Sequence, residues 1–348
     1  MGRNLLWASL AVAPITILVD KLTGAGDVTL FVLAALSLIP LAWLIGESTE
    51  HAAEHTGPGI GGFLNASFGN APELIVALFA VGANLPEVVR GSLSGSVISN
   101  LLLVYGVTQI AGTDGARIDR RSLLLQIGLI GVAVVAFVAP ATLGYTGAPE
   151  RNAVVIASVP VAIVLLLLYL AVVGRNLRRH HESERARGEP SEGTWSLLTA
   201  LAVLAVATAV TAWISEILVH SLGAFAEAVG LSEFFIAVVI VAIVGNAAEH
   251  GGAIVIAHNG KMRLATEIAI SSAAQVGLLV VPVVTLLSLL FSNHLALAFR
   301  WTELFAMAGA AVVVAATVWD GTSRRKEGAF LVAAYAAAVV GFLLGGGR

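Results

Sequence analysis

The chain of 348 residues contains no cysteine, and only 12% of its residues are charged. Without cysteine, disulfides, iron–sulfur clusters and thiol catalysis are excluded. A soluble domain carries about 25% charged residues, so half that share indicates a membrane protein with several spans. The sequence also lacks a Walker motif, because Gly260 and Lys261 are followed by Met262. No nucleophile–base pair or cofactor motif occurs, so we expect neither an enzyme, a bound cofactor nor a nucleic-acid partner.

Long apolar runs dominate what is present: 58% of the residues are hydrophobic, and the mean hydropathy is +0.92. A run of about 20 apolar residues is long enough to span a membrane as a helix. The first run has no small-residue cleavage site before Asp20, so we expect it to remain as a first span. The sequence therefore predicts an all-α polytopic protein of a prokaryotic cell membrane. Its eleven transmembrane helices are expected at about 5–20, 28–50, 60–82, 86–111, 121–140, 152–174, 196–220, 232–258, 262–291, 296–318 and 328–346.

One hydrophilic interruption, at 175–195, has the composition of a linker. It divides the chain into a first helix at 1–22, five spans at 23–174 and five more at 196–348. Lys and Arg gather in alternate loops, which predicts a cytoplasmic N-terminus, a cytoplasmic linker and an outer C-terminus. The residues on the cytoplasmic side are Arg3, Arg117, Arg120, Arg121, Arg175, Arg178, Arg179, Arg185, Arg187, Lys261, Arg263, Arg324, Arg325 and Lys326.

A short motif occurs once in each block of five spans. Gly69-Asn70-Ala71-Pro72-Glu73 returns as Gly245-Asn246-Ala247-Ala248-Glu249, each time inside a long apolar run. A carboxylate in mid-membrane costs roughly 2.5–3.5 kcal/mol on insertion scales, so two at matched positions indicate a function. Because five is odd, the second block enters the membrane from the opposite side. This predicts a 5+5 inverted repeat with a site at the midplane; two structural carboxylates bonded to nearby serines are the alternative interpretation.

The residues of both motifs favour broken helices that hold a cation. The glycines weaken the helix, and Pro72 removes a backbone donor. Unwound backbone at this depth lines a cavity, where its carbonyls can bind a cation. The ligand set consists of oxygens only, which suits a hard cation such as Ca²⁺ and not a softer metal. The candidate metal ligands are Glu73, Glu249, Asn70, Asn246, Gly69 and Gly245.

The spans after each motif carry a second polar set. Asn100 follows Glu73 at almost the same distance as Gln275 follows Glu249. Amides often join helices in membranes, and that interpretation stays open for both. Two further residues are candidates for a proton path, and three glutamates on one helical face are candidates for a cytoplasmic entrance or for a solvated helix end. The three groups are Ser96, Ser99, Asn100, Ser271, Ser272 and Gln275; His250 and Glu216; and Glu47, Glu50 and Glu54.

Two facing carboxylates also couple two kinds of ion. Without a metal between them they repel each other, which favours protonation. The site is then occupied by a divalent cation or by protons, and this exclusion predicts an exchanger in place of a leak. A passive cation channel is the alternative from another class of function.

At these residues the sequence resembles the calcium/proton antiporters, the cation exchanger branch of the calcium/cation antiporter superfamily. The similarity covers 30–291 and includes the two motifs, Glu47-Ser48-Thr49-Glu50 and Ser215-Glu216-Ile217. The resemblance implies a sodium/calcium exchanger-like fold and two glutamates that bind Ca²⁺ in alternation with H⁺. Pro72 stands where many relatives have Val, and the pair Pro72-Glu73 resembles the sodium/calcium exchanger branch. Na⁺ as the driving ion therefore remains an alternative, as does Mn²⁺ as the cargo. We expect membrane lipid, Ca²⁺ and H⁺ as partners, and a homo-oligomer is compatible with the sequence.

Overall fold

The computed structural model describes residues 2–145, 148–183 and 195–345, which form helices apart from one pair of two-residue strands. The expected all-α membrane fold is confirmed in this coarse form. The first elements are α1 (Gly2–Ser9), α2 (Val12–Leu22), α3 (Asp27–Phe68), α4 (Ala71–Gly82), α5 (Pro86–Ile98), the π-helical η1 (Ser99–Val104), α6 (Tyr105–Ala111), β1 (Ala116–Arg117), α7 (Arg120–Tyr145) and α8 (Asn152–Ser183). The others are α9 (Leu197–Val229), α10 (Glu233–Phe235), the π-helical η2 (Ile236–Val241), α11 (Ala242–Gly245), α12 (Ala247–His258), α13 (Met262–Gln275), the π-helical η3 (Val276–Val280), α14 (Val281–Ser288), α15 (Trp301–Val318), β2 (Thr322–Ser323) and α16 (Arg325–Gly345).

Within the described residues, 9 helices are long and apolar enough to cross a membrane. A further candidate is a bent pair, Glu233–Gly245 and Ala247–His258, whose two parts meet at 56°. Helix α4 is apolar but has only 12 residues. At 1.5 Å per residue it extends about 18 Å, which is short of the roughly 30 Å hydrocarbon core.

Two predicted interruptions between spans are helical in the structure. Hydropathy predicts separate spans at 28–50 and 60–82, whereas α3 continues to Phe68 and the chain breaks only at Gly69 and Asn70. Helix α8 likewise continues to Ser183, past the predicted span end at 174. An apolar run ends where polar side chains begin, whereas a helix ends where its backbone hydrogen bonds end, so the two ends need not coincide. The remainder of the predicted linker, 184–194, lies outside the described residues.

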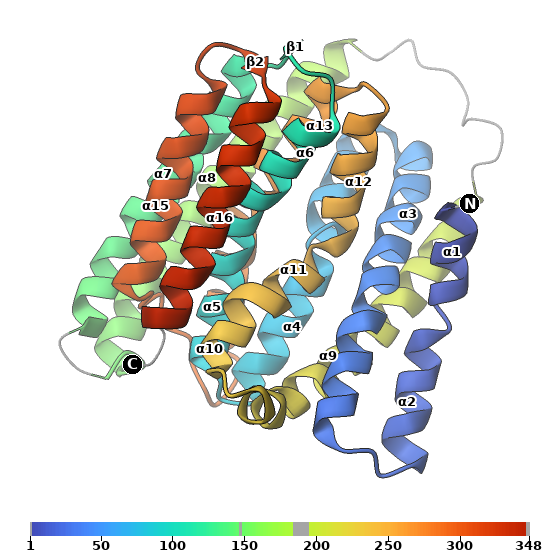
Figure 1. Cartoon of the computed structure of the whole chain (residues 1–348), viewed down its shortest axis with the longest axis vertical. Coiled ribbons are helices and arrows are strands. Elements are labelled where there is room, and N and C mark those ends of the chain that lie inside the picture. The colour runs from blue at the N-terminus through green and yellow to red at the C-terminus, as the bar shows by residue number, and fades with distance from the viewer. Residues whose placement is uncertain (1, 146–147, 184–194, 346–348) are drawn as a thin grey trace.

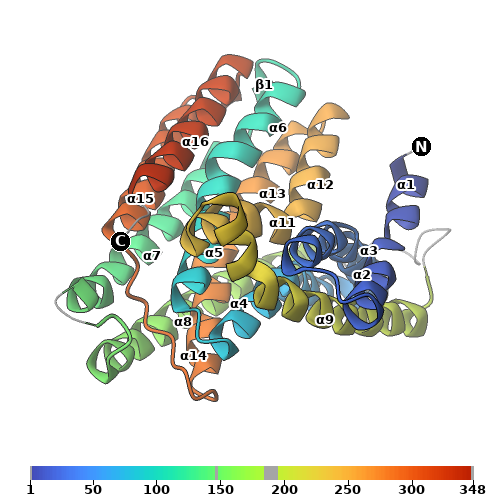
Figure 2. The same ribbon diagram turned by 60° about the horizontal axis from the view of Figure 1, so that its bottom comes forward.

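The helices form two outer groups with the broken helices between them. Helices α6, α7, α15 and α16 lie on one side in both views, and α1, α2, α3 and α9 lie on the other (Figures 1 and 2). Helix α3 packs along α9, α7 packs on α15, and α6 packs on α16. Helices α4 and α11 occupy the middle, so both chain breaks lie inside the bundle (Figures 1 and 2).

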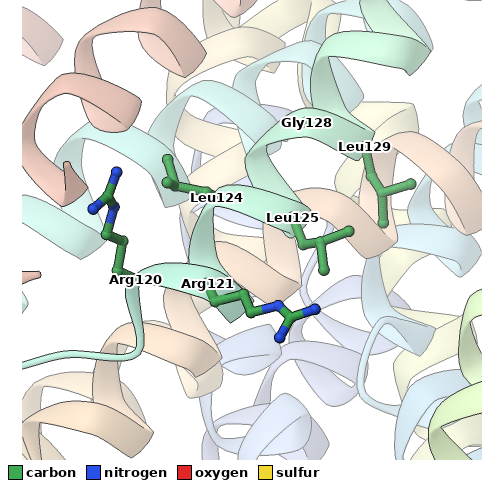
Figure 3. A pocket seen from close by; sticks show the side chains of 6 residues that line it. All are labelled: Arg120, Arg121, Leu124, Leu125, Gly128 and Leu129. Carbon is green, nitrogen blue, oxygen red and sulfur yellow. The ribbon is translucent and has the colours of Figure 1, made fainter.

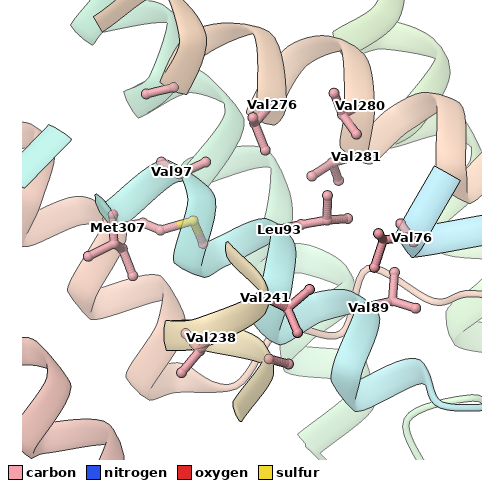
Figure 4. Packing of buried hydrophobic residues seen from close by; sticks show 14 of the residues in the cluster. Val76, Val89, Leu93, Val97, Val238, Val241, Val276, Val280, Val281 and Met307 are labelled. Carbon is pink, nitrogen blue, oxygen red and sulfur yellow. The ribbon is translucent and has the colours of Figure 1, made fainter. Parts of the chain in front are cut away.

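Helix α5 lies at the centre of the apolar core (Figure 4). Its Leu93 and Val97 are buried among valines that come from both blocks of the chain. Gly95 permits this approach, because a Cβ there would overlap the backbone carbonyl of Val238 on η2. The two blocks therefore share one core. The valines around α5 are Val76 of α4, Val238 and Val241 of η2, and Val276 and Val280 of η3.

A small polar assembly closes one end of the bundle. Strand β1 pairs antiparallel with β2, with Ala116 opposite Ser323 and Arg117 opposite Thr322. Asp119, just before α7, accepts a hydrogen bond from the Ser122 N–H and forms a salt bridge with Arg263. The Ser122 N–H, and to a smaller extent Arg263, hold the pKa of Asp119 below its ordinary value. These contacts tie the start of α7 to α13 and α16.

Candidate functional site

The two motifs have almost the same backbone geometry. Asn70 joins α3 to α4 with φ −97° and ψ 15°, and Asn246 joins α11 to α12 with φ −97° and ψ 5°. Pro72 lies in the first turn of α4, where a missing N–H removes no helical hydrogen bond. Glu73 and Glu249 occupy the first turns of α4 and α12, so each carboxylate lies at the positive end of a helix dipole.

The structure brings the two carboxylates together inside the bundle. Glu73 is buried, with 7% of its surface exposed, and it lies within electrostatic range of Glu249. Gly245 borders the pair, because a Cβ added there would lie 3.2 Å from the Cγ of Glu73. Glu249 is half-buried and lies beside Ser272. Each acidic side chain therefore lies against a residue of the second block.

Amide side chains cross between the blocks at both breaks. The Nδ2 of Asn70 donates to the Oε1 of Gln275 at 2.6 Å. In the matching place, the Nδ2 of Asn100 donates to the Oδ1 of Asn246 at 3.5 Å and to the Oγ of Ser272 at 3.1 Å. Asn100 is the second residue of the π-helical turn η1, and Gln275 directly precedes η3. π-Helical turns are rare and occur mostly at functional sites.

Asn246 is held at both ends of its amide. Its Nδ2 donates to the Oγ of Ser96 at 2.8 Å and to the backbone carbonyl of Ala242 at 3.1 Å. Its Oδ1 also accepts from the hydroxyl of Ser272 at 3.5 Å. The sequence offers no signal for the carbonyl of Ala242, because the partner is a backbone atom whose direction depends on the helix break. The amide groups were predicted, but their pairing across the two blocks was not.

Four of the buried atoms left without a hydrogen-bond partner are acceptors on these residues, while others, such as the hydroxyls of Tyr169 and Thr211, lie elsewhere in the bundle. Both carboxylate oxygens of Glu73, the Oε2 of Glu249 and the Oδ1 of Asn100 have no donor among the described residues. Two buried negative charges with no counter-charge are costly. A cation between the carboxylates would satisfy these oxygens together. Within the described part of the chain no cluster of three or more His, Cys, Asp or Glu side chains that could hold a metal occurs.

The other predicted site residues differ in where the structure places them. Ser99 is buried and donates to the carbonyl of Ser96, one turn earlier on the same helix. The hydroxyl of Ser271 donates to the carbonyl of Ile268 on its own helix at 3.2 Å. It therefore does not join the hydrogen bonds that connect Asn100, Asn246 and Ser272. His250 follows Glu249 and is buried, and its Nε2 has no partner among the described residues.

Four predicted glutamates lie elsewhere. Glu216 lies on the exposed face of α9, whereas its neighbour Ser215 lies on the buried face. Among the described residues, Glu216 therefore does not join Glu73 and Glu249. Glu47, Glu50 and Glu54 lie on α3 before the break, where Glu47 is 3.8 Å from His51. The sequence did not predict the aromatic group beside them, in which the ring of His51 stacks on Trp195 at 4.5 Å. Trp7 and Trp43 extend this group.

A helical membrane protein with two broken helices and facing carboxylates has the architecture of a secondary transporter. Residues 27–177 and 199–344 match the family described as sodium/calcium exchanger protein. The chain belongs to this family. It is thus a transporter of the antiporter kind and not an enzyme.

Relatives match over most of their length. The Ca²⁺/H⁺ antiporter ChaA of Bacillus subtilis is 40% identical over 328 residues, which cover 90% of this chain and 92% of that protein. A Ca²⁺/H⁺ antiporter of Synechocystis is 34% identical and covers 92% of both chains. The solved structure of native YfkE superposes with a TM-score of 0.83 at 37% identity, over 97% of this chain and 99% of that one. A solved H⁺/Ca²⁺ exchanger CAX shares the fold, with a TM-score of 0.77 at 15% identity over 98% of this chain and 92% of that one.

Proposed function

We propose that this protein is a secondary-active antiporter that exchanges Ca²⁺ for H⁺, with the cation bound between Glu73 and Glu249. The observation that carries the proposal is the set of buried oxygen acceptors without donors around these two residues. Relatives of similar length named Ca²⁺/H⁺ antiporter support the choice of ions. The ions are cargo, and no resident cofactor is part of the proposal.

Charge balance explains why the site would exchange and not leak. Neutralising two carboxylates takes either one Ca²⁺ or two protons, so both states remove the same negative charge. An empty, ionised site would bury two unpaired charges, at several kcal/mol per ion. The binding site would therefore change its accessibility when occupied by either cargo and resist the change when empty. In this scheme Asn70, Asn246 and the backbone at Gly69 and Gly245 complete the ligand shell.

The proposed membrane arrangement has eleven spans: one N-terminal span and two inverted blocks of five. The segment before Gly69 and helix α4 together would form one broken span, and α10 to α12 would form its counterpart. The matched pairs Asn70–Gln275 and Asn246–Asn100 support this relation, because each joins a break to the other block. The distribution of Lys and Arg in the sequence supports an N-terminus in the cytoplasm and a C-terminus outside a prokaryotic cell membrane.

The supporting residues receive smaller roles in the proposal. Ser96, Asn100, Ser272 and Gln275 would hold the two motif amides in place, and Ser99 would support Ser96. His250, buried beside Glu249, would take part in a proton path. Glu216 has no place in this proton path, because it lies on an exposed face of α9. Glu47, Glu50 and Glu54 would gather cations at the entrance.

Flux in proteoliposomes tests the assignment. With inside and outside pH, Na⁺ and Ca²⁺ set independently, a pH gradient should drive uptake of radiolabelled Ca²⁺ in the unmodified protein. Glu73→Gln and Glu249→Gln should each reduce this uptake to the background of empty vesicles. Transport retained by either variant would reject the paired-carboxylate site.

The same vesicles separate the alternatives. Uptake driven by a Na⁺ gradient at equal pH would favour a Na⁺-driven exchanger. Competition by Mn²⁺ would favour Mn²⁺ as a further transported ion. A cation channel would pass Ca²⁺ at equal pH and without Na⁺, with a reversal potential set by Ca²⁺ alone. Membrane lipid surrounds the protein in each case. A homo-oligomer would not change the site, because all proposed ligands come from one chain.

A further inference from the structure

A groove lies along the start of α7, away from the carboxylate pair. It has a volume of about 720 Å³ and is lined by Arg120, Arg121, Leu124, Leu125, Gly128 and Leu129 (Figure 3). We propose that this groove binds one anionic phospholipid, with the phosphate at the two arginines and the upper part of an acyl chain along the leucines and Gly128. The proposal does not depend on which ions the protein transports.

The two arginines carry positive charge that the described chain does not balance. Neither Arg120 nor Arg121 forms a salt bridge with a described residue. The acids nearby are engaged elsewhere: Asp119 binds Arg263, and Asp320 binds Arg324 at 2.8 Å. Asp119 also accepts from the Ser122 N–H and Asp320 from the Thr322 N–H, and these hydrogen bonds hold the pKa of each acid below its ordinary value.

The two guanidinium groups, and not the helix N-terminus, would provide the attraction for an anion. Both arginines lie in the first turn of α7. The carboxylate of Asp119, just before that turn, already accepts from the Ser122 N–H and so occupies the positive end of the helix dipole. An incoming phosphate would therefore bind to the guanidinium groups. The side chains leave the helix in different directions and flank the groove (Figure 3).

One arginine is held at the level expected for a lipid headgroup. The guanidinium of Arg120 lies 4.4 Å above the ring of Trp319, at the end of α15. Trp319 is 63% exposed. Tryptophan at the end of a span sits at the boundary between headgroups and hydrocarbon. This places the arginines at the depth of lipid phosphates, on the side that the distribution of Lys and Arg assigns to the cytoplasm.

The apolar part of the groove begins directly below the arginines. Leu125 is 61% exposed, and a Cβ at Gly128 would meet no atom within 4 Å, so the surface is open there. From Arg121 to Gly128 the helix rises about 10 Å, which is less than half of a roughly 30 Å hydrocarbon core. The same face continues with Val132 and Val135, which are 49% and 72% exposed. The groove therefore fits a single leaflet.

The combination of features selects the ligand. Free phosphate would use the arginines but not the apolar groove, and a zwitterionic lipid would use the groove but gain little from two unpaired guanidinium groups. Basic pockets on the cytoplasmic side of membrane helices suit anionic headgroups. An anionic phospholipid such as phosphatidylglycerol uses both parts.

Binding of phosphatidylglycerol and phosphatidylcholine to the purified full-length protein tests the proposal, with native mass spectrometry as the readout. R120Q/R121Q should lose about tenfold or more of the preference for phosphatidylglycerol, as expected for two basic residues at an anionic surface. R117Q/K326Q is the matched control, because it removes the same charge from the same end of the molecule outside the groove. It should keep the preference.

A second pair of variants tests the apolar part without changing charge. G128L should fill the groove and weaken phosphatidylglycerol binding, while G131L, on the same helix and equally open but outside the groove, should not. Both sites have room for a side chain, so both variants are expected to fold. Equal binding of the two lipids by the unmodified protein, equal loss in G131L or R117Q/K326Q, or full displacement of the lipid by inorganic phosphate would each overturn the proposal.

Discussion

The two broken helices have the same backbone geometry at the break but differ in their surroundings. Asn70 and Asn246 have matching φ and ψ, and each is followed by a carboxylate in the next turn. Yet Glu73 is buried with no partner for either oxygen, while Glu249 is half-buried beside Ser272. In the proposed inverted repeat the two helices would lead to opposite faces of the membrane, so we expect one conformation to place them in different surroundings.

The largest expected effect concerns the carboxylates. Ca²⁺ at about 100 times its Kd should stabilise the folded protein by about 2.7 kcal/mol. Glu73→Gln and Glu249→Gln should each abolish this stabilisation, since one carboxylate and one amide hold a divalent cation poorly. Without Ca²⁺, Glu73→Gln should raise the melting temperature more than Glu249→Gln, because it removes the more deeply buried acid.

Thermal unfolding in detergent, with and without Ca²⁺, measures both effects. Glu216→Gln is the control, because this glutamate is exposed on α9. It should leave the Ca²⁺ stabilisation intact. A larger gain for Glu249→Gln than for Glu73→Gln would contradict the deeper burial of Glu73.

A smaller effect is expected at the glycine that borders the pair. In Gly245→Ala the new methyl group would press on the side chain of Glu73 at 3.2 Å. Overpacking costs about 1–3 kcal/mol, so the affinity for Ca²⁺ should fall by about tenfold. Gly251→Ala, in the same helix region, meets no atom within 4 Å and should keep the affinity. Calcium titration by calorimetry measures both, and equal losses would contradict the close contact between Gly245 and Glu73.

Two adjacent serines on α13 differ in whether they contact the site residues. Ser272 accepts from Asn100 and lies beside Glu249, whereas Ser271 bonds to Ile268 of its own helix. Ser272→Ala should weaken Ca²⁺ binding by about 0.5–1.5 kcal/mol, a few-fold to tenfold change in the apparent KM of transport. Ser271→Ala should leave the KM unchanged. The reverse order would show that α13 is rotated in the working protein.

These differences show what the sequence could and could not predict. The paired motifs, the facing carboxylates and the corresponding places of Asn100 and Gln275 follow from a repeat that is visible in the chain. The choice of Ser272 over Ser271 does not, because it depends on the rotation of α13 about its axis. The same holds for Glu216, because the rotation of α9 about its axis decides whether Glu216 or its neighbour Ser215 is buried. Helix ends at Phe68 and Ser183 were also missed, because hydropathy reports the membrane and not the hydrogen bonds of the helix.

The smallest effect is expected where the two motifs differ most in sequence. Pro72 and Ala248 occupy the same position in the first turn, and the first helical donors are the N–H groups of Leu74 and His250. Neither position therefore contributes a helical hydrogen bond, so Pro72→Ala and the reciprocal Ala248→Pro should change stability by less than about 1 kcal/mol. Both variants should retain Ca²⁺ uptake driven by a pH gradient, and neither should gain uptake driven by Na⁺. If Pro72→Ala changed the driving ion, the identity of this residue, and not only the geometry that the two halves share, would decide what is exchanged for Ca²⁺.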